Sequence, residues 1–113
     1  MSIEAMWQVN FGATPQGEVG FGAGVIVIET GRILGGDSSF YYLGTYSIAG
    51  DDVTCEIEVR RHAAGHPSVL GKDDSKLKLR AKLNDQTMLF VGTDAENPMV
   101  KFQAEIRRLA ELP

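Results

Sequence analysis

Apolar and polar side chains alternate along most of this chain, and the alternation is clearest across residues 35–61. In the first half of this stretch one parity carries the bulky residues Phe40, Tyr42, Tyr46 and Ile48. In the second half one parity carries Val53, Cys55, Ile57 and Val59. A period of two gives a strand one buried and one exposed face, as in an antiparallel sheet. Segment 49–52 (AGDD) predicts the turn between the two strands, because Gly and Asp accept the positive φ of hairpin turns.

The same reasoning predicts further short strands along the rest of the chain, at residues 3–11, 18–29, 32–34, 75–83, 86–92 and 100–107. Segment 12–17 (GATPQG) is predicted to be a turn, and 62–74 and 94–98 are predicted loops. The tail, residues 107–112, is predicted to form a short helical turn, since Leu109, Ala110 and Leu112 favour helix. Consecutive antiparallel strands close most economically into a barrel without exposed edges. We therefore expect an all-β protein in which residues 1–113 form one up-and-down barrel of about eight strands.

The strand at 18–29 has glycine at positions 20, 22 and 24, followed by Val-Ile-Val-Ile. A dinucleotide-binding loop needs a helix after its glycines, so the pattern does not indicate a nucleotide site. Alternating glycines instead indicate strong coiling, a bulge, or a ligand or second backbone lying close. Parity alone leaves open which face of this strand points inward.

Charge and composition exclude several classes of partner. The net charge is −4 over 113 residues, which argues against direct nucleic-acid binding. The basic residues Lys76, Lys78, Arg80 and Lys82 alternate with leucine and alanine and are predicted to form the solvent face of a strand. No apolar run approaches the roughly 20 residues that span a bilayer. The first residues do not resemble a signal peptide, and the chain has one cysteine, so we expect a cytoplasmic protein without membrane contact.

The candidate chemistry is sparse. His62 and His66 lie in a predicted loop without further zinc ligands nearby, and the parity of Cys55 makes it a buried thiol. The pairs Asp51-Asp52 and Asp73-Asp74 are most simply turn residues, since no apolar pocket would raise a carboxyl pKa there. Asp37, which follows Gly-Gly, is likewise most simply a turn residue. We therefore expect a protein that is not an enzyme and needs no metal or cofactor.

Aromatic residues could line the barrel interior, and the best placed are Trp7, Phe21, Tyr42 and Tyr46. Tyrosine has an apolar ring and a polar tip, which suits a ligand pocket or an interface as well as a core. A filled core and a cavity for a small apolar ligand both remain open.

Several segments resemble the GrlR family of small bacterial proteins, whose best-known member is a negative regulator of type III secretion. They are a Trp-bearing first strand, residues 22–37 (GAGVIVIETGRILGGD), residues 41–46 (YYLGTY), and residues 60–71 (RRHAAGHPSVLG). The resemblance implies a lipocalin-like barrel that dimerises and silences a transcriptional activator through an acidic turn. The matching turn here, Gly50-Asp51-Asp52, carries part of that acidic element, so Asp51 and Asp52 are the implied partner-binding residues.

Two functional hypotheses follow. The first is an interaction protein: an acidic, dimeric barrel that binds a protein partner through Asp51 and Asp52. The second is a small-molecule carrier that uses the barrel interior.

Overall fold

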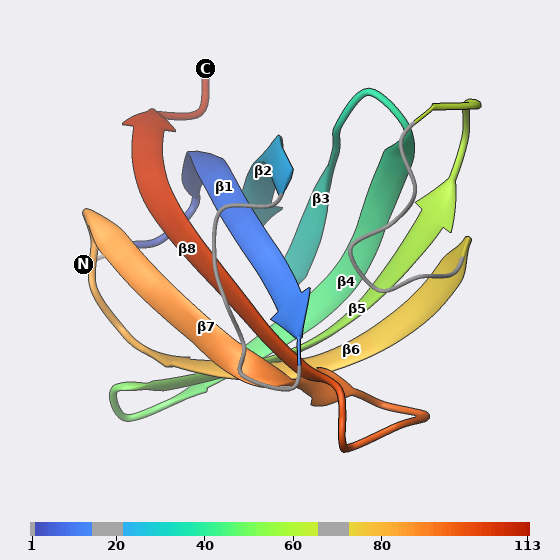
Figure 1. The fold of residues 1–113 in the computed structure, drawn as a ribbon. Helices are drawn as coiled ribbons and strands as arrows, with labels where there is room; N and C mark the ends of the chain where they lie inside the picture. Colours follow the sequence, from blue (N-terminus) through green and yellow to red (C-terminus); the bar gives the residue numbers. More distant parts are fainter. Residues whose placement is uncertain (1, 15–21, 66–72) are drawn as a thin grey trace.

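Eight antiparallel strands form a closed barrel in the computed structural model, with each strand paired to its neighbours in sequence and the last paired to the first (Figure 1). The structure describes residues 2–14, 22–65 and 73–113. The strands are β1 (Ala5–Thr14), β2 (Gly22–Glu29), β3 (Arg32–Gly36), β4 (Phe40–Ala49), β5 (Asp52–Arg61), β6 (Asp74–Lys82), β7 (Thr87–Asp94) and β8 (Lys101–Ala110). The predicted eight-stranded up-and-down barrel is confirmed.

The hairpin of β4 and β5 turns at residues 49–52, where the sequence predicts the turn. Tyr46 lies opposite Cys55, and Ala49 lies opposite Asp52 across the turn. Gly50 in that turn has a φ of +64°, a backbone conformation that glycine adopts without steric cost. The alternating pattern and the turn composition therefore fix this hairpin together.

Pairing between β1 and β8 closes the barrel and corrects two predictions. The predicted helical turn at residues 107–112 is wrong, because β8 continues as a strand to Ala110, which lies opposite Met6. The predicted turn at 12–17 begins too early, since Gly12 to Thr14 still pair with β8, and residues 15–17 lie outside the described part of the chain. In both places inter-strand hydrogen bonds outweigh the local preferences of the sequence.

Alternate side chains of every strand meet in one core inside the barrel. β6 shows this most clearly, with the pattern exposed–buried repeated along its whole length. Lys76, Lys78, Arg80 and Lys82 form the solvent face, as predicted, and Cys55 is buried, also as predicted. The largest fully buried side chains are those of Trp7, Ile28, Ile33, Val53 and Ile106. Within the described residues there is no helix that could cross a membrane.

Candidate functional site: an interior cavity and an outer apolar row

The barrel core is not completely filled. A cavity of about 250 Å³ lies inside it, and its wall is mostly apolar, including Phe11, Ile33, Leu79, Phe90 and Phe102. Its polar wall comes from the connection between β3 and β4 and from the start of β4: Asp37, Ser38, Ser39 and Tyr42. Ser38 is exposed, so this connection lies between the cavity wall and the molecular surface. An apolar chamber with a few convergent polar groups is the usual form of a small-molecule site.

Asp37 organises the polar end. One carboxylate oxygen, Oδ1, accepts hydrogen bonds from the main-chain N–H groups of Ser39 (2.9 Å) and Phe40 (2.8 Å). The other, Oδ2, accepts a hydrogen bond from the hydroxyl of Tyr42. Asp side chains commonly bond to the backbone two or three residues on, and this preference makes 37–40 a turn. The turn therefore fixes the carboxylate beside the phenol ring.

The Tyr42 hydroxyl stays protonated across the physiological range. Burial raises its pKa far above the usual range, and the hydrogen bond and negative charge of Asp37 raise the pKa further. Tyr42 therefore acts as a neutral donor toward Asp37, and its hydroxyl oxygen keeps acceptor capacity.

Both glycines of β2 have a packing explanation. A Cβ atom at Gly22 would lie 2.5 Å from the ring of Phe11, and one at Gly24 would lie 2.9 Å from the Tyr42 hydroxyl oxygen. The two rings contact each other edge to face, with centroids 6.1 Å apart. The missing side chains of β2 thus make room for aromatic rings at the cavity wall, and Gly20 lies outside the described residues.

The structure separates the aromatic residues that the sequence grouped together. Tyr42 lines the cavity, whereas Trp7 is fully buried in the core, where its Nε1–H donates to the carbonyl oxygen of Ile3 (3.0 Å). Tyr46 is partly buried and borders an outer groove rather than the cavity. Phe21 lies outside the described residues.

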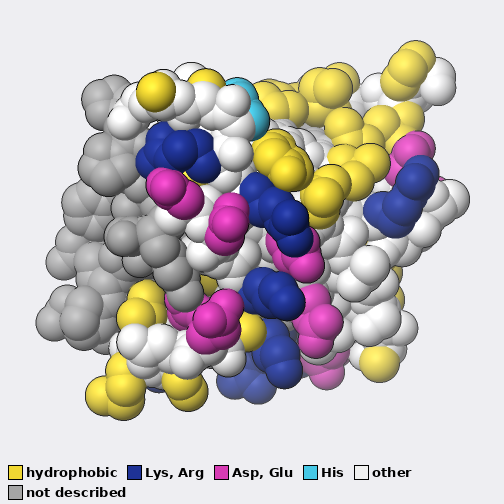
Figure 2. All heavy atoms as spheres, turned by 90° about the vertical axis from the view of Figure 1, so that its right-hand side faces the viewer, with side chains coloured by type: hydrophobic (Ala, Val, Ile, Leu, Met, Phe, Trp, Pro, Cys, Tyr) yellow, Lys and Arg dark blue, Asp and Glu magenta, His cyan; other side chains and the backbone are white. Residues whose placement is uncertain are grey.

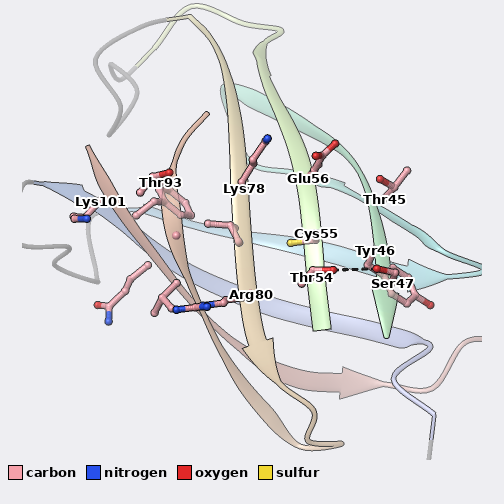
Figure 3. A pocket seen from close by; sticks show the side chains of 15 residues that line it. Thr45, Tyr46, Ser47, Thr54, Cys55, Glu56, Lys78, Arg80, Thr93 and Lys101 are labelled. Atoms are coloured by element: carbon pink, nitrogen blue, oxygen red, sulfur yellow. Dashed lines mark hydrogen bonds between the residues drawn. The ribbon is translucent and has the colours of Figure 1, made fainter. Parts of the chain in front are cut away.

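An open groove of about 950 Å³ runs over β4 to β8 (Figure 3). Its floor includes one row of cross-strand partners from successive strands: Thr45, Glu56, Lys78, Thr93 and Lys101. The hydroxyls of Ser47 and Thr54 lie 3.0 Å apart, the hydrogen bond drawn as a dashed line in Figure 3. The groove is open to solvent, and its lining combines hydroxyls and charges of both signs with apolar groups such as those of Tyr46, Val91 and Phe102.

The outer surface over β1 to β4 differs from this groove, because its cross-strand row is entirely apolar. Met6, Val27, Leu34 and Leu43 are successive cross-strand partners on these four strands, and we call them the outer apolar row. Leu43 is 45% exposed and Met6 38%. Val25 (41% exposed) and Tyr41 lie beside this row. In Figure 2 hydrophobic side chains gather on one part of the surface, beside rows of alternating positive and negative side chains.

Asp51 and Asp52 are exposed at the tip of the β4–β5 hairpin. Both contact the Lys82 ammonium, whose Nζ lies 2.6 Å from Asp52 Oδ1 and 3.6 Å from Asp51 Oδ1. Their hydrogen bonds and charges raise the pKa of Lys82. The turn is therefore less acidic than its sequence indicates, because one cation already lies between the two carboxylates.

Other candidate groups have structural roles. His62 Nε2 lies 3.0 Å from the main-chain oxygen of Asp37, while His66 lies outside the described residues. Asp73 forms an ion pair with Arg61 (2.7 Å). Within the described ranges no three His, Cys, Asp or Glu side chains are grouped closely enough to hold a metal ion.

Sequence reasoning missed two features of the site. The pairing of Asp37 with Tyr42 had no signal beyond the turn-forming Asp, because it depends on how the turn folds back onto β4. The outer apolar row did have a signal: Val25 to Ile28 and Ile33-Leu34 are apolar at both parities, the pattern of strands covered on both faces.

Comparison with protein-family models gives no match to this chain. Comparison with curated proteins gives none either.

Proposed function

We propose that this protein is a non-enzymatic interaction module, a barrel that self-associates and regulates a protein partner in the cytoplasm. The observation that carries the proposal is the outer apolar row. Four apolar side chains on four adjacent strands expose a continuous stripe, and such stripes on a protein surface mark interaction sites. The resemblance to the GrlR family, with its lipocalin-like, dimeric regulator, supports the same function.

The occupant that best fits the outer apolar row is a second copy of the chain. Two Glu–Arg pairs border the row. Glu29 with Arg32 (3.1 Å) lies beside it on β2 and β3, and Glu58 with Arg60 (2.8 Å) lies at its β5 end, where Glu58 is opposite Leu43. A two-fold axis places the same surface opposite itself. Flanks that carry both signs can then meet with opposite charges in contact, whereas a strongly acidic or basic partner would face like charges.

The dimer is tested by comparing two exposed leucines. Leu43 in the row is 45% exposed and lies opposite Glu58, and Leu89 on β7 is 46% exposed and lies opposite Glu105. We expect the wild-type protein and Leu89→Lys to sediment as dimers, and Leu43→Lys to sediment as a monomer with an unchanged circular dichroism spectrum. A monomeric wild type, or a Leu43→Lys variant that remains dimeric, would contradict the assignment.

The partner site proposed from the resemblance is the Asp51-Asp52 turn. Pull-down from a native lysate should recover a stoichiometric protein that Asp51→Asn/Asp52→Asn loses. Asp85→Asn, which changes another exposed turn carboxylate, should retain it. Removing two exposed charges has little effect on stability, so both variants should melt like the wild type. If the double variant still retains the partner, the assignment of the partner site to Asp51 and Asp52 is wrong.

The interior cavity favours a second candidate function, a carrier or sensor of a small apolar ligand. Its volume of about 250 Å³ exceeds the roughly 150 Å³ of an engineered cavity that binds benzene. Native mass spectrometry of the purified protein tests this: an added mass that leaves on denaturation supports a carried ligand. A bare mass together with no binding of small apolar probes argues against it.

A further inference from the structure

We propose that the interior cavity selects a small amphiphile with an apolar body and a protonated amine head, and that the Asp37 carboxylate receives the ammonium group. The proposal names the ligand class for the second candidate function and rests on it. Neither the resemblance nor the apolar cavity wall by itself specifies such a head group.

The size and lining of the cavity define the body of the ligand. At about 250 Å³ the cavity falls just below the roughly 300–1,000 Å³ of typical ligand pockets. Aromatic and branched aliphatic side chains form most of the wall, with Phe11 and Phe102 stacked at a centroid distance of 5.9 Å. One ring or a short branched chain therefore fits, whereas a fatty acid or a sterol does not.

The charge at the polar end defines the head group. Asp37 is only partly exposed, and the three groups that donate hydrogen bonds to its carboxylate are neutral: two main-chain N–H groups and one hydroxyl. In the described part of the chain no Lys, Arg or His forms an ion pair with this carboxylate. Desolvated carboxylates are normally paired with a cation. The wall of the cavity thus carries a negative charge that no described side chain pairs with a cation.

The neighbouring basic side chains, Arg61 and His62, contact groups other than the Asp37 carboxylate. The guanidinium of Arg61 lies over the ring of Phe40, 4.5 Å from its centroid, and bonds to Asp73. The His62 ring contacts the main-chain oxygen of Asp37 rather than its carboxylate. A cation for Asp37 must therefore come from outside the described protein groups.

An ammonium group matches the acceptors that remain. Each carboxylate oxygen offers two acceptor sites, so Oδ2, which accepts only the Tyr42 hydroxyl, keeps one. The Tyr42 oxygen, which donates to Asp37, can itself accept a hydrogen bond from the ligand. An ammonium carries three donors and no acceptor, so it can bond to both oxygens at once. A ligand carboxylate would meet the negative charge of Asp37 and be repelled.

Three ligands with one shared ring separate the possibilities: phenethylamine, phenethyl alcohol and phenylacetate. Titration calorimetry on the wild-type chain should show phenethylamine binding at least about tenfold tighter than the alcohol, because hydrogen bonds to charged groups are about twice as strong as neutral ones. Phenylacetate should bind most weakly. This series needs no variant, so it does not depend on the folding of a mutant.

Variants then assign the preference to Asp37. Asp37→Asn keeps an acceptor for the Ser39 and Phe40 N–H groups, so the turn is retained. It should remove the roughly tenfold advantage of the amine and leave alcohol binding unchanged. Glu105→Gln, which neutralises an exposed carboxylate on the outer face, should retain the advantage. Ala104→Leu, at a buried position in the cavity wall, should block the amine and the alcohol alike.

Two kinds of result would overturn the inference. One contradicts only the ligand class, and the other also contradicts the carrier function. If the alcohol binds as tightly as the amine, or if Asp37→Asn keeps the preference, the ligand class is wrong and the ligand-binding barrel stands. If none of the three ligands binds, or if binding persists in Ala104→Leu, the ligand class and the carrier function both fail. The proposed dimer is unaffected by either result.

Discussion

The thiol of Cys55 illustrates how strongly one side chain depends on its burial. Cys55 is 5% exposed on the inner face of β5. Burial raises its pKa from the ordinary value of 9.0 to about 12, because the thiolate would lose its hydration, and the charge of Glu56 adds to the effect. The folded protein therefore holds this proton more tightly than the unfolded chain does.

This shift predicts a loss of stability at alkaline pH. Cys55 contributes its full stabilisation below pH 9.0, and the contribution falls between pH 9.0 and about 12. Over this window the unfolded chain binds fewer protons than the folded one, so the free energy of unfolding decreases by up to about 1.4 kcal/mol per pH unit. Urea unfolding, followed by the fluorescence of Trp7, measures it.

Cys55→Ala is the control, because it removes the titrating group from the same site. Its free energy of unfolding should be lower at neutral pH, since a buried side chain has been shortened, and should fall less steeply above pH 9.0. Equal slopes for the two proteins would mean that other groups cause the alkaline loss.

At the residue scale the sequence predicted which side chains are buried better than it predicted which side chains form hydrogen bonds or ion pairs with one another. The burial of Cys55 and the exposure of the lysines on β6 both follow from the two-residue period of a strand, so both predictions were correct. The role of Asp37 could not be predicted, because the Tyr42 hydroxyl reaches it only when the turn and β4 are both folded. Likewise the sequence of the Asp51-Asp52 turn gives no sign of Lys82, which comes from the neighbouring strand β6.

Close approach between β6 and β7 depends on one glycine. A Cβ atom at Gly92 would lie 1.9 Å from the carbonyl oxygen of Lys78 and 2.9 Å from the Cα atom of Leu79. Both are main-chain atoms that cannot rotate away. β7 can therefore pair with β6 at this register only without a side chain at position 92.

Gly92→Ala should accordingly destabilise the barrel by about 2–3 kcal/mol, since the two strands must separate to admit the methyl group. Thermal and urea unfolding measure the loss. Gly50→Asn is the matched control: nothing lies within 4 Å of a Cβ atom there, and Asn tolerates positive φ, so the cost should be about 1 kcal/mol or less. Equal losses in both variants would contradict this role for Gly92.

Strand identity was predictable at the element scale, but strand ends were not. The pattern of residues 100–107 predicted β8, yet the strand extends to Ala110 because β1 offers hydrogen-bond partners that far. Local preference for helix in Leu109 and Ala110 is worth only tenths of a kcal/mol per residue. Pairing along the neighbouring strand is the larger contribution.

Arg108 connects three parts of the molecule that are distant in sequence. Its guanidinium donates to the main-chain oxygens of Ser2 (3.0 Å) and Asp85 (3.1 Å) and bonds to Glu111. It also lies 5.6 Å from the ring centroid of Trp7. The N-terminal segment, the β6–β7 turn and the tail therefore meet at one side chain, which is 14% exposed.

Arg108→Met should lower the free energy of unfolding by about 1.5–3 kcal/mol, because hydrogen bonds to charged groups are lost and two carbonyl oxygens lose their donor. Arg107→Met is the control. Arg107 is exposed, and among the described side chains its guanidinium bonds only to Gln8, so replacing it should change the free energy of unfolding by no more than about 0.5 kcal/mol. Faster amide exchange in β1 of the Arg108 variant, but not of the Arg107 variant, would show that the stability is lost where Arg108 bonds. Equal stability losses in the two variants would contradict this role for Arg108.

For the whole molecule, the sequence by itself determined the all-β class, the number of strands, the central hairpin and the inward or outward position of most side chains. These properties follow from the two-residue period and from turn composition, which are local. The tertiary structure alone decided the register and extent of the pairing that closes β8 on β1, the pairing of Asp37 with Tyr42, the size of the cavity and the assembly of the outer apolar row. Each of these requires side chains from separate strands to meet, and their distances depend on strand register and barrel curvature rather than on spacing along the chain.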